Sequence, residues 1–154
     1  MMAPASDPPA GAFDGDAHLL PIRVYYEDTD AAGLVYYANY LRFAERARTE
    51  MMRMLGVDHP GLMATDGVVF AVRHCSADYL APARLDDPLQ VVTRLAEVRG
   101  VSLTLDQRVR RDGTDLVRIG LKLVCMTLTG RPARIPAALR ARLATHLNRS
   151  NRST

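Results

Sequence analysis

The spacing of hydrophobic residues changes near residue 67 and divides the chain into a helical part and a strand part. Between residues 37 and 55, apolar side chains recur every three or four positions, which predicts one long amphipathic helix. Asn39 is the expected N-cap, and Gly56 is expected to end the helix. The apolar stripe of this helix consists of Tyr40, Ala44, Ala47, Met51 and either Met54 or Leu55.

From Gly67 onward, apolar residues alternate with polar ones, which is the period of a β-strand. This alternation predicts four strands, at residues 68–80, 89–98, 102–110 and 116–128. A further strand is expected at residues 22–27, and a short helix at residues 135–147. One long helix beside strands joined by short turns is typical of an α+β fold, in which an antiparallel sheet wraps the helix.

The two ends of the chain differ in composition from the part between them. Residues 1–20 are rich in Pro, Gly, Ala and Asp, so we predict a disordered N-terminal segment followed by one domain at residues 21–147. Residues 148–154 are expected to form a basic tail. The chain has no apolar run of 18 residues and no basic start followed by an apolar stretch, so we expect a cytoplasmic protein without a transmembrane segment.

Positive charge is concentrated towards the C-terminus. Residues 131–154 contain six arginines and no acidic residue, which leaves 14 basic and 17 acidic residues in the remainder. Basic segments that bind single-stranded nucleic acid combine their charge with aromatic side chains, and this one has none of Phe, Tyr or Trp. We therefore expect a solvated segment and no nucleic-acid partner.

The positions of cysteine and histidine argue against a disulfide and a metal site. Cys75 and Cys125 lie 50 residues apart in apolar, strand-like runs, so both are expected to be buried, reduced thiols. The four histidines show neither HxH nor HxxxH spacing. The sequence therefore predicts no metal site.

Two aspartates precede the long helix in a short turn-like segment. Asp28 and Asp30 lie upstream of a helix N-terminus, where backbone N–H groups are unpaired and the helix dipole is positive. A carboxylate beside such donors is the minimum set for acyl transfer, because the donors hold a developing oxyanion. The alternative is that Asp30 only caps the turn or the helix, and spacing alone favours that reading.

Resemblance to a known family favours the catalytic interpretation of Asp30 over the capping one. Residues 25–40, YYEDTDAAGLVYYANY, resemble the signature of the 4-hydroxybenzoyl-CoA thioesterase family. Residues 43–50, FAERARTE, and residues 79–87, YLAPARLDD, are similar to its YbgC branch, the acyl-CoA thioesterases associated with the Tol-Pal cell-envelope system. The likeness extends from about residue 22 to residue 144.

The resemblance implies a hotdog fold and hydrolysis of an acyl-CoA to free acid and CoA, with CoA as part of the substrate and no cofactor. It also implies a homodimer or homotetramer with active sites at the subunit interface. Asp30 matches the family's catalytic carboxylate, acting as nucleophile or general base, and the backbone N–H of Tyr37 matches the group that polarises the thioester carbonyl. We assign substrate binding to Gly33, Val35 and Arg99, the last because a guanidinium suits a CoA phosphate.

One difference from YbgC-type sequences, at position 37, is compatible with a second function. Many YbgC-type sequences have histidine where this chain has Tyr37, and a tyrosine leaves the backbone N–H in place but removes a base effective near neutral pH. The alternative is a weakly catalytic or non-catalytic acyl-CoA-binding or scaffold protein, linked to lipid synthesis or the cell envelope. A hotdog dehydratase is disfavoured because the chain lacks a Phe-Pro run before the helix.

Three other acidic side chains are weaker candidates. Glu45 and Glu50 lie on the helix near arginines, where ion pairs are the expected role, including one between Arg46 and Glu50. Asp28 is expected to shape the loop.

Overall fold

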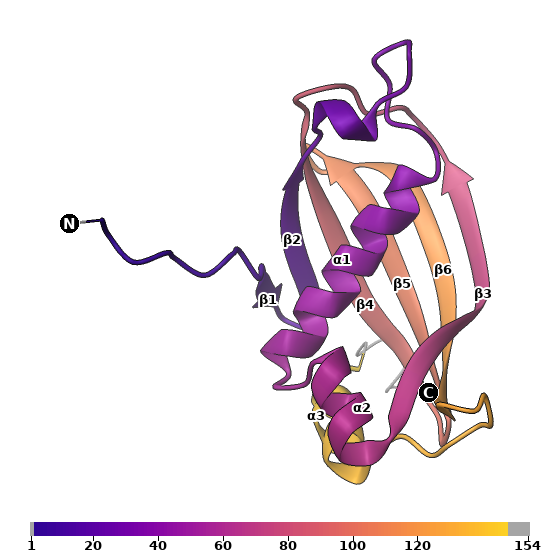
Figure 1. Ribbon diagram of the computed structural model, residues 1–154. Helices are drawn as coiled ribbons and strands as arrows, with labels where there is room; N and C mark the ends of the chain where they lie inside the picture. The colour runs from indigo at the N-terminus through magenta and orange to yellow at the C-terminus, as the bar shows by residue number, and fades with distance from the viewer. Residues whose placement is uncertain (1, 148–154) are drawn as a thin grey trace.

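The computed structural model of the protein describes residues 2–147, in which a six-stranded antiparallel sheet curves around one long helix (Figure 1). The strands lie in the order β1-β2-β4-β5-β6-β3, so that β1 and β3 form the edges of the sheet. This arrangement confirms the predicted α+β class. The strands are β1 (Ala12–Asp14), β2 (Ala17–Arg23), β3 (Val68–Tyr79), β4 (Pro88–Val98), β5 (Ser102–Arg111) and β6 (Thr114–Thr127).

The long helix α1 (Asn39–Met54) packs its apolar stripe against one face of the sheet. Tyr40, Ala44 and Ala47 are almost completely buried there, as the helical spacing predicts. Gln107 on β5 is also fully buried beneath the helix, and its Nε2 donates hydrogen bonds to the Ala44 carbonyl and the Thr93 hydroxyl, both at 2.9 Å. These bonds fix the position of the helix over the sheet and its rotation about its axis, because moving the helix would leave the buried amide of Gln107 unpaired.

Two short helices lie near the end of the sheet at which β3 begins. The helix α2 (His59–Asp66) begins at Asp58, whose carboxylate accepts the Gly61 N–H at 2.6 Å. It ends at Gly67, which adopts a left-handed conformation with φ of 65°. Because only eight residues form it and its apolar pattern is weak, the sequence reading did not predict it. The last helix, α3 (Ala137–Thr145), lies within the predicted range.

The prediction of a disordered segment at residues 1–20 is wrong from Ala12 onward. Strand β1 pairs with β2, and all seven residues of β2 pair with β4. The strand was missed because Pro21 lies within it, and proline is rarely found inside a sheet. The apolar residues Ala17 and Leu20 are nevertheless 3% exposed and belong to the core.

The structure corrects two other predictions. The strand expected at residues 22–27 ends at Arg23, and residues 26–28 form a 3-10 turn (η1, Tyr26–Asp28). Cys125 is buried as predicted, but Cys75 is exposed, because β3 is an edge strand. The predicted basic tail at residues 148–154 lies outside the described residues.

Residues 2–147 contain neither a membrane-spanning helix nor a cluster of metal ligands. No helix in this range is long and apolar enough to cross a membrane. Within the same range, no cluster of three or more His, Cys, Asp or Glu side chains is arranged to hold a metal ion.

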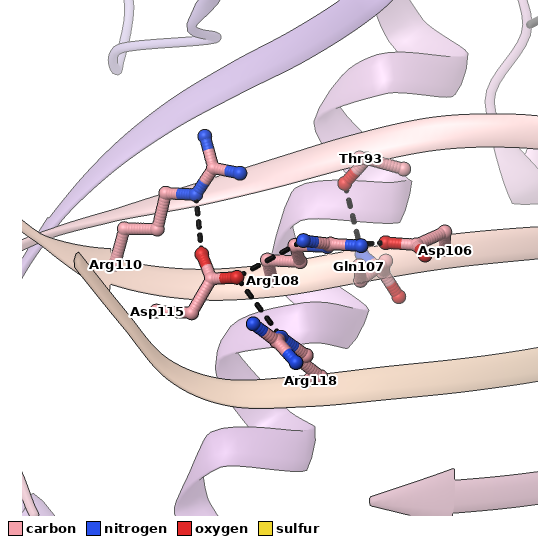
Figure 2. A network of polar contacts seen from close by, with 7 residues as sticks. All are labelled: Thr93, Asp106, Gln107, Arg108, Arg110, Asp115 and Arg118. Atoms are coloured by element: carbon pink, nitrogen blue, oxygen red, sulfur yellow. Dashed lines mark hydrogen bonds and ion pairs between the residues drawn. The ribbon is translucent and has the colours of Figure 1, made fainter. Parts of the chain in front are cut away.

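The sheet face opposite α1 carries a network of charged residues (Figure 2). Asp115 accepts hydrogen bonds from Arg108 at 3.0 Å, from Arg110 at 2.6 Å and from Arg118 at 3.0 Å. Gln107 points towards α1, so its neighbours along β5 point to the opposite face. Despite partial burial of Asp115, the three guanidinium groups lower its carboxyl pKa to about 2.

We expect this network to make stability fall in acid. The folded-state pKa of Asp115 lies below its ordinary value of 3.8, so its contribution is complete above that value and is lost as the pH falls towards 2. Because the arginines are partly solvated, the contribution should be about 1 kcal/mol. Urea unfolding between pH 5 and 2 measures it, with Asp115→Asn as the control that should lose less stability over this range. Equal losses in both proteins would contradict the assignment.

Candidate active site

The segment that carries Asp30 is a tight loop closed by backbone hydrogen bonds. The Asp30 N–H donates to the Leu34 carbonyl at 2.8 Å, and the Gly33 N–H donates to the Asp30 carbonyl at 3.0 Å. Gly33 has φ of 76°, a left-handed conformation that a side chain disfavours. Gly33 therefore has a conformational role in the turn, and it is not among the residues that line the pocket described below.

One oxygen of the Asp30 carboxylate is held by this loop. Its Oδ1 accepts the backbone N–H groups of Ala32 at 2.9 Å and of Leu34 at 3.2 Å. No donor among residues 2–147 bonds to Oδ2, and the residue is exposed. Asp30 thus has a fixed orientation and one oxygen available for reaction.

A second carboxylate, that of Asp28, connects the loop to the start of α1. Asp28 is 8% exposed, its Oδ1 accepts Asn39 Nδ2 at 2.9 Å, and its Oδ2 accepts the Tyr25 N–H at 2.9 Å. Asn39 was predicted to cap the helix, but its side chain makes this bond and the N-cap is Ala38. The backbone carbonyl of Asp28 also accepts the Tyr36 N–H at 2.9 Å. The expectation that Asp28 shapes the loop is therefore confirmed.

The approach to α1 exposes two unused donors. The N–H groups of Tyr37 and Ala38 have no acceptor among residues 2–147, whereas the N–H groups on either side, of Tyr36 and Asn39, are hydrogen-bonded. Unpaired N–H groups at the positive end of a helix are suited to an oxyanion. The backbone N–H of Tyr37, which the resemblance assigns to the thioester carbonyl, is thus available to bind a substrate oxygen.

Asp30 and Tyr37 line the same pocket, which has a volume of about 450 Å³. Val35, predicted to contact substrate, also lines it and is fixed by a bond from its N–H to the Ala83 carbonyl at 2.9 Å. The remaining lining residues are Leu34, Tyr36, Tyr40, Tyr79, Leu80, Ala81 and Pro82.

Tyrosine rings form much of the pocket wall. The ring centroids of Tyr37 and Tyr79 are 6.2 Å apart in an edge-to-face arrangement, and those of Tyr40 and Tyr79 are 5.8 Å apart. Burial raises the pKa of Tyr40 and of Tyr79 above the ordinary value of 10, so both hydroxyls remain protonated near neutral pH. The carboxylate of Asp30 is therefore the base that lines this pocket.

The wall at residues 79–82 was not predicted as part of the site. The Tyr79 hydroxyl donates to the Tyr37 carbonyl at 3.3 Å, and the Ala83 N–H donates to the Tyr40 hydroxyl at 2.9 Å. These bonds join the end of β3 to the start of α1. The available signal was the block at residues 79–87, which resembles the YbgC branch but was interpreted only as a strand and bend.

Arg99 does not lie in this pocket. It follows β4 at the end of the sheet opposite to η1, where it pairs with Glu97 at 2.5 Å. Arg108 and Arg110 of β5 are also engaged elsewhere, because both bind Asp115. On α1, Glu50 approaches Arg53 at 4.0 Å, and the predicted pair with Arg46 does not form.

Comparison with known proteins identifies the family of this chain. Residues 24–143 match the model of the thioesterase-like superfamily. The chain is 46% identical over 121 residues to the acyl-CoA thioester hydrolase YbgC of Escherichia coli O6:H1, covering 77% of this chain and 90% of that protein. It is 41% identical to the acyl-CoA thioesterase YbgC of Haemophilus influenzae, covering 79% and 90%.

Comparison with solved structures supports the same family. A probable thioesterase from Bartonella henselae superposes with a TM-score of 0.76 at 32% identity, covering 78% of this chain and 99% of that one. A hypothetical protein from Thermus thermophilus gives 0.79 at 30% identity, covering 86% and 98%. The fold is therefore the hotdog fold of thioesterases. The chain belongs to the thioesterase-like superfamily and, within it, to the YbgC acyl-CoA thioesterases.

We expect Asp28→Asn to destabilise the protein. An amide can accept only one of the two hydrogen bonds that Asp28 accepts and presents an N–H group to the other donor, so one buried polar group loses its partner at a cost of about 1–3 kcal/mol. Urea unfolding measures this loss. Asp112→Asn is the control, because Asp112 lies in an exposed hairpin turn with φ of 52°, a conformation that Asn tolerates. The interpretation fails if both variants unfold at the same urea concentration.

Proposed function

We propose that the protein hydrolyses the thioester of an acyl-CoA to a free acid and CoA, with Asp30 as the catalytic carboxylate. The observation that carries this proposal is that Asp30, with one oxygen unengaged, lines the same pocket as the unpaired N–H of Tyr37. The names of the YbgC relatives support the substrate class. Another relative, the 1,4-dihydroxy-2-naphthoyl-CoA hydrolase of Thermosynechococcus vestitus, is also named for a CoA thioester.

Two routes use this geometry. In both, the carbonyl oxygen accepts the Tyr37 N–H, which stabilises the negative charge that develops on it. In the first route, Asp30 Oδ2 bonds to the acyl carbon as the C–S bond breaks and CoA leaves as a thiolate, and water then cleaves the mixed anhydride. In the second, Asp30 takes a proton from a water molecule whose oxygen attacks the acyl carbon; the tetrahedral intermediate then collapses as the C–S bond breaks, and CoA leaves as a thiolate.

Replacement of Asp30 by Asn should remove most of the activity. The amide is neither a base nor a comparable nucleophile, so kcat should fall by about 30- to 900-fold, equivalent to about 2–4 kcal/mol. Tyr37→Phe should retain activity within about threefold, because the proposed role belongs to the backbone N–H. Release of CoA from hexanoyl-, palmitoyl- and benzoyl-CoA measures both variants.

The same assay distinguishes the alternative function. Negligible turnover of every acyl-CoA by the wild-type protein, together with micromolar binding, would favour an acyl-CoA-binding or scaffold protein and contradict the hydrolase. Activity of Asp30→Asn within threefold of wild type would exclude Asp30 as the catalytic group. Partners in lipid synthesis or the envelope system, and the cytoplasmic location, stay predictions.

We also propose that a second copy of the chain covers β3. This strand has β6 on one side only, so the polar groups of its outer edge are open to pairing. Apolar side chains beside that edge are exposed, including Val72 at 53% and Tyr79 at 47%. Because Tyr79 also lines the Asp30 pocket, a partner at this edge would border the active site.

This assembly predicts a dimer or a tetramer in solution. Cys75 is exposed near the middle of β3, so Cys75→Asp would place like charges close together across a two-fold axis and weaken association. Cys75→Ser is the matched neutral control. Sedimentation velocity should show oligomers for wild type and Cys75→Ser but a shift towards monomer for Cys75→Asp. A monomeric wild-type protein at micromolar concentration would rule out this interface.

A further inference from the structure

A short segment near the N-terminus covers a fully buried histidine. We call residues 8–14 the strap; it contains β1, which pairs antiparallel with β2. His18 on β2 is 0% exposed, and its Nε2 lies 2.8 Å from the Ala10 carbonyl oxygen of the strap. The ring of Phe13 contacts His18 edge-to-face, with the centroids 5.3 Å apart. The strap therefore closes over the imidazole and helps to shield it from solvent.

The strap lies closer to β2 than a side chain would permit. A Cβ on Gly11 would collide with the Leu19 carbonyl and would lie 3.0 Å from His18 Cε1. Gly11 also has φ of 75°, which a side chain disfavours. Further along the strap, Phe13 stacks on His146 at the end of α3, with the centroids 4.0 Å apart. The glycine and the two ring contacts thus hold the strap in one position.

The imidazole of His18 has one nitrogen with a partner and one without. A carbonyl oxygen can only accept, so the bond to Ala10 requires the hydrogen to be on Nε2. The other nitrogen, Nδ1, is buried and has no hydrogen-bond partner among residues 2–147. Protonation would add a hydrogen and a positive charge at this nitrogen, where nothing accepts the new donor. The docked strap therefore suits the neutral imidazole and disfavours the imidazolium.

The titratable groups on the neighbouring elements act in opposite directions. Glu50 on α1 attracts a positive charge on His18, but its Oε1 also lies 4.0 Å from Arg53 Nε. His146 on α3 stacks on Phe13, so a charge on it would repel a charged His18 across that ring. No carboxylate among residues 2–147 forms an ion pair with His18.

The charged residues of β1 and β4 beside His18 lie on the other face of the sheet. Asp14 and Arg94 are both cross-strand partners of Ala17, whereas His18 is paired with Phe13 and with Thr93. Because successive side chains of a strand point to opposite faces, neither charged group shares the face of His18.

Burial outweighs these charges. It is the largest influence on His18 and lowers its pKa below the ordinary value of 6.5, although the Ala10 carbonyl and Glu50 act to raise the pKa. A histidine whose pKa is lower in the docked state binds its proton better when the strap is free. Docking is therefore at its strongest above pH 6.5 and weakens as the pH falls towards the docked-state pKa.

We propose that the strap is a pH-sensitive latch, which is docked while His18 is neutral and is released when His18 takes up a proton. Release would let water solvate the imidazolium. The core would stay folded, because β1 has only three residues and β2 keeps its pairing with β4. None of these residues lines the Asp30 pocket, so the latch does not depend on the hydrolase reaction.

Hydrogen–deuterium exchange followed by mass spectrometry measures release in the wild-type protein. After correction for the intrinsic pH dependence of exchange, protection of a peptide covering residues 10–17 should fall by up to about tenfold per pH unit below pH 6.5, because one proton is bound on release. Peptides from β4 and β5 should keep their protection from pH 8 to pH 5. Constant protection of the strap, or an equal loss in the β4 and β5 peptides, would overturn the proposal.

His18→Gln tests the assignment to this imidazole. The Nε2 of glutamine can donate to the Ala10 carbonyl as the histidine does, but the amide takes up no proton near neutral pH. The strap of this variant should stay protected down to pH 5. His146→Gln is the matched control, because it removes the other histidine that contacts Phe13, and it should keep the wild-type pH dependence. The opposite result in either variant would contradict the latch.

Imidazole ¹⁵N chemical shifts of the wild-type protein decide the question even if His18→Gln fails to fold. His18 should carry its hydrogen on Nε2 at pH 8, and Nδ1 should gain a proton with the same midpoint as the loss of strap protection. Titration of His18 without release of the strap would refute the proposal. Such a failure would leave the thioesterase proposal intact, since that proposal is tested by CoA release.

Discussion

The buried carboxylate of Asp28 is the constraint on which the candidate active site depends. It accepts one hydrogen bond from the backbone that follows β2 and one from the first residue of α1, so it joins the loop to the helix. Without it, the loop that carries Asp30 and the N–H of Tyr37 would be connected only through the chain between them and through weaker contacts. A fixed spacing between a carboxylate and an oxyanion donor is what acyl transfer requires.

Two aspartates two residues apart have different roles because their environments differ. Asp28 is 8% exposed and both of its oxygens accept hydrogen bonds, which makes it a structural group. Asp30 is exposed and uses only Oδ1 to order its own loop, so Oδ2 is open to the pocket. The sequence shows two equivalent acids, and only the fold distinguishes the one that is held from the one that is available.

The sequence predicted those parts of the structure that depend on local patterns. Helix α1 and strands β3 to β6 were placed within two residues at each end, because their apolar residues recur with a clear period. Strand β2 was missed because Pro21 obscures its pattern, and the 79–82 wall was missed because it reaches Tyr37 only through tertiary contact. Arg99 was a plausible phosphate ligand by residue type, but the direction of β4 carries it to the far end of the sheet.

In a single chain, the exposed tyrosines of the pocket and the unpaired edge of β3 lie on the same side of α1. Gln107 attaches the helix above β5, and β3 lies two strands away at the edge of the sheet. Tyr37 is 61% exposed and Tyr79 is 47% exposed on this side, although both line the Asp30 pocket. Aromatic side chains exposed around a pocket and beside an unpaired strand edge are unfavourable in water unless something covers them. The position of the helix over the sheet therefore accounts for an open pocket in the single chain, which the proposed second copy at β3 would border.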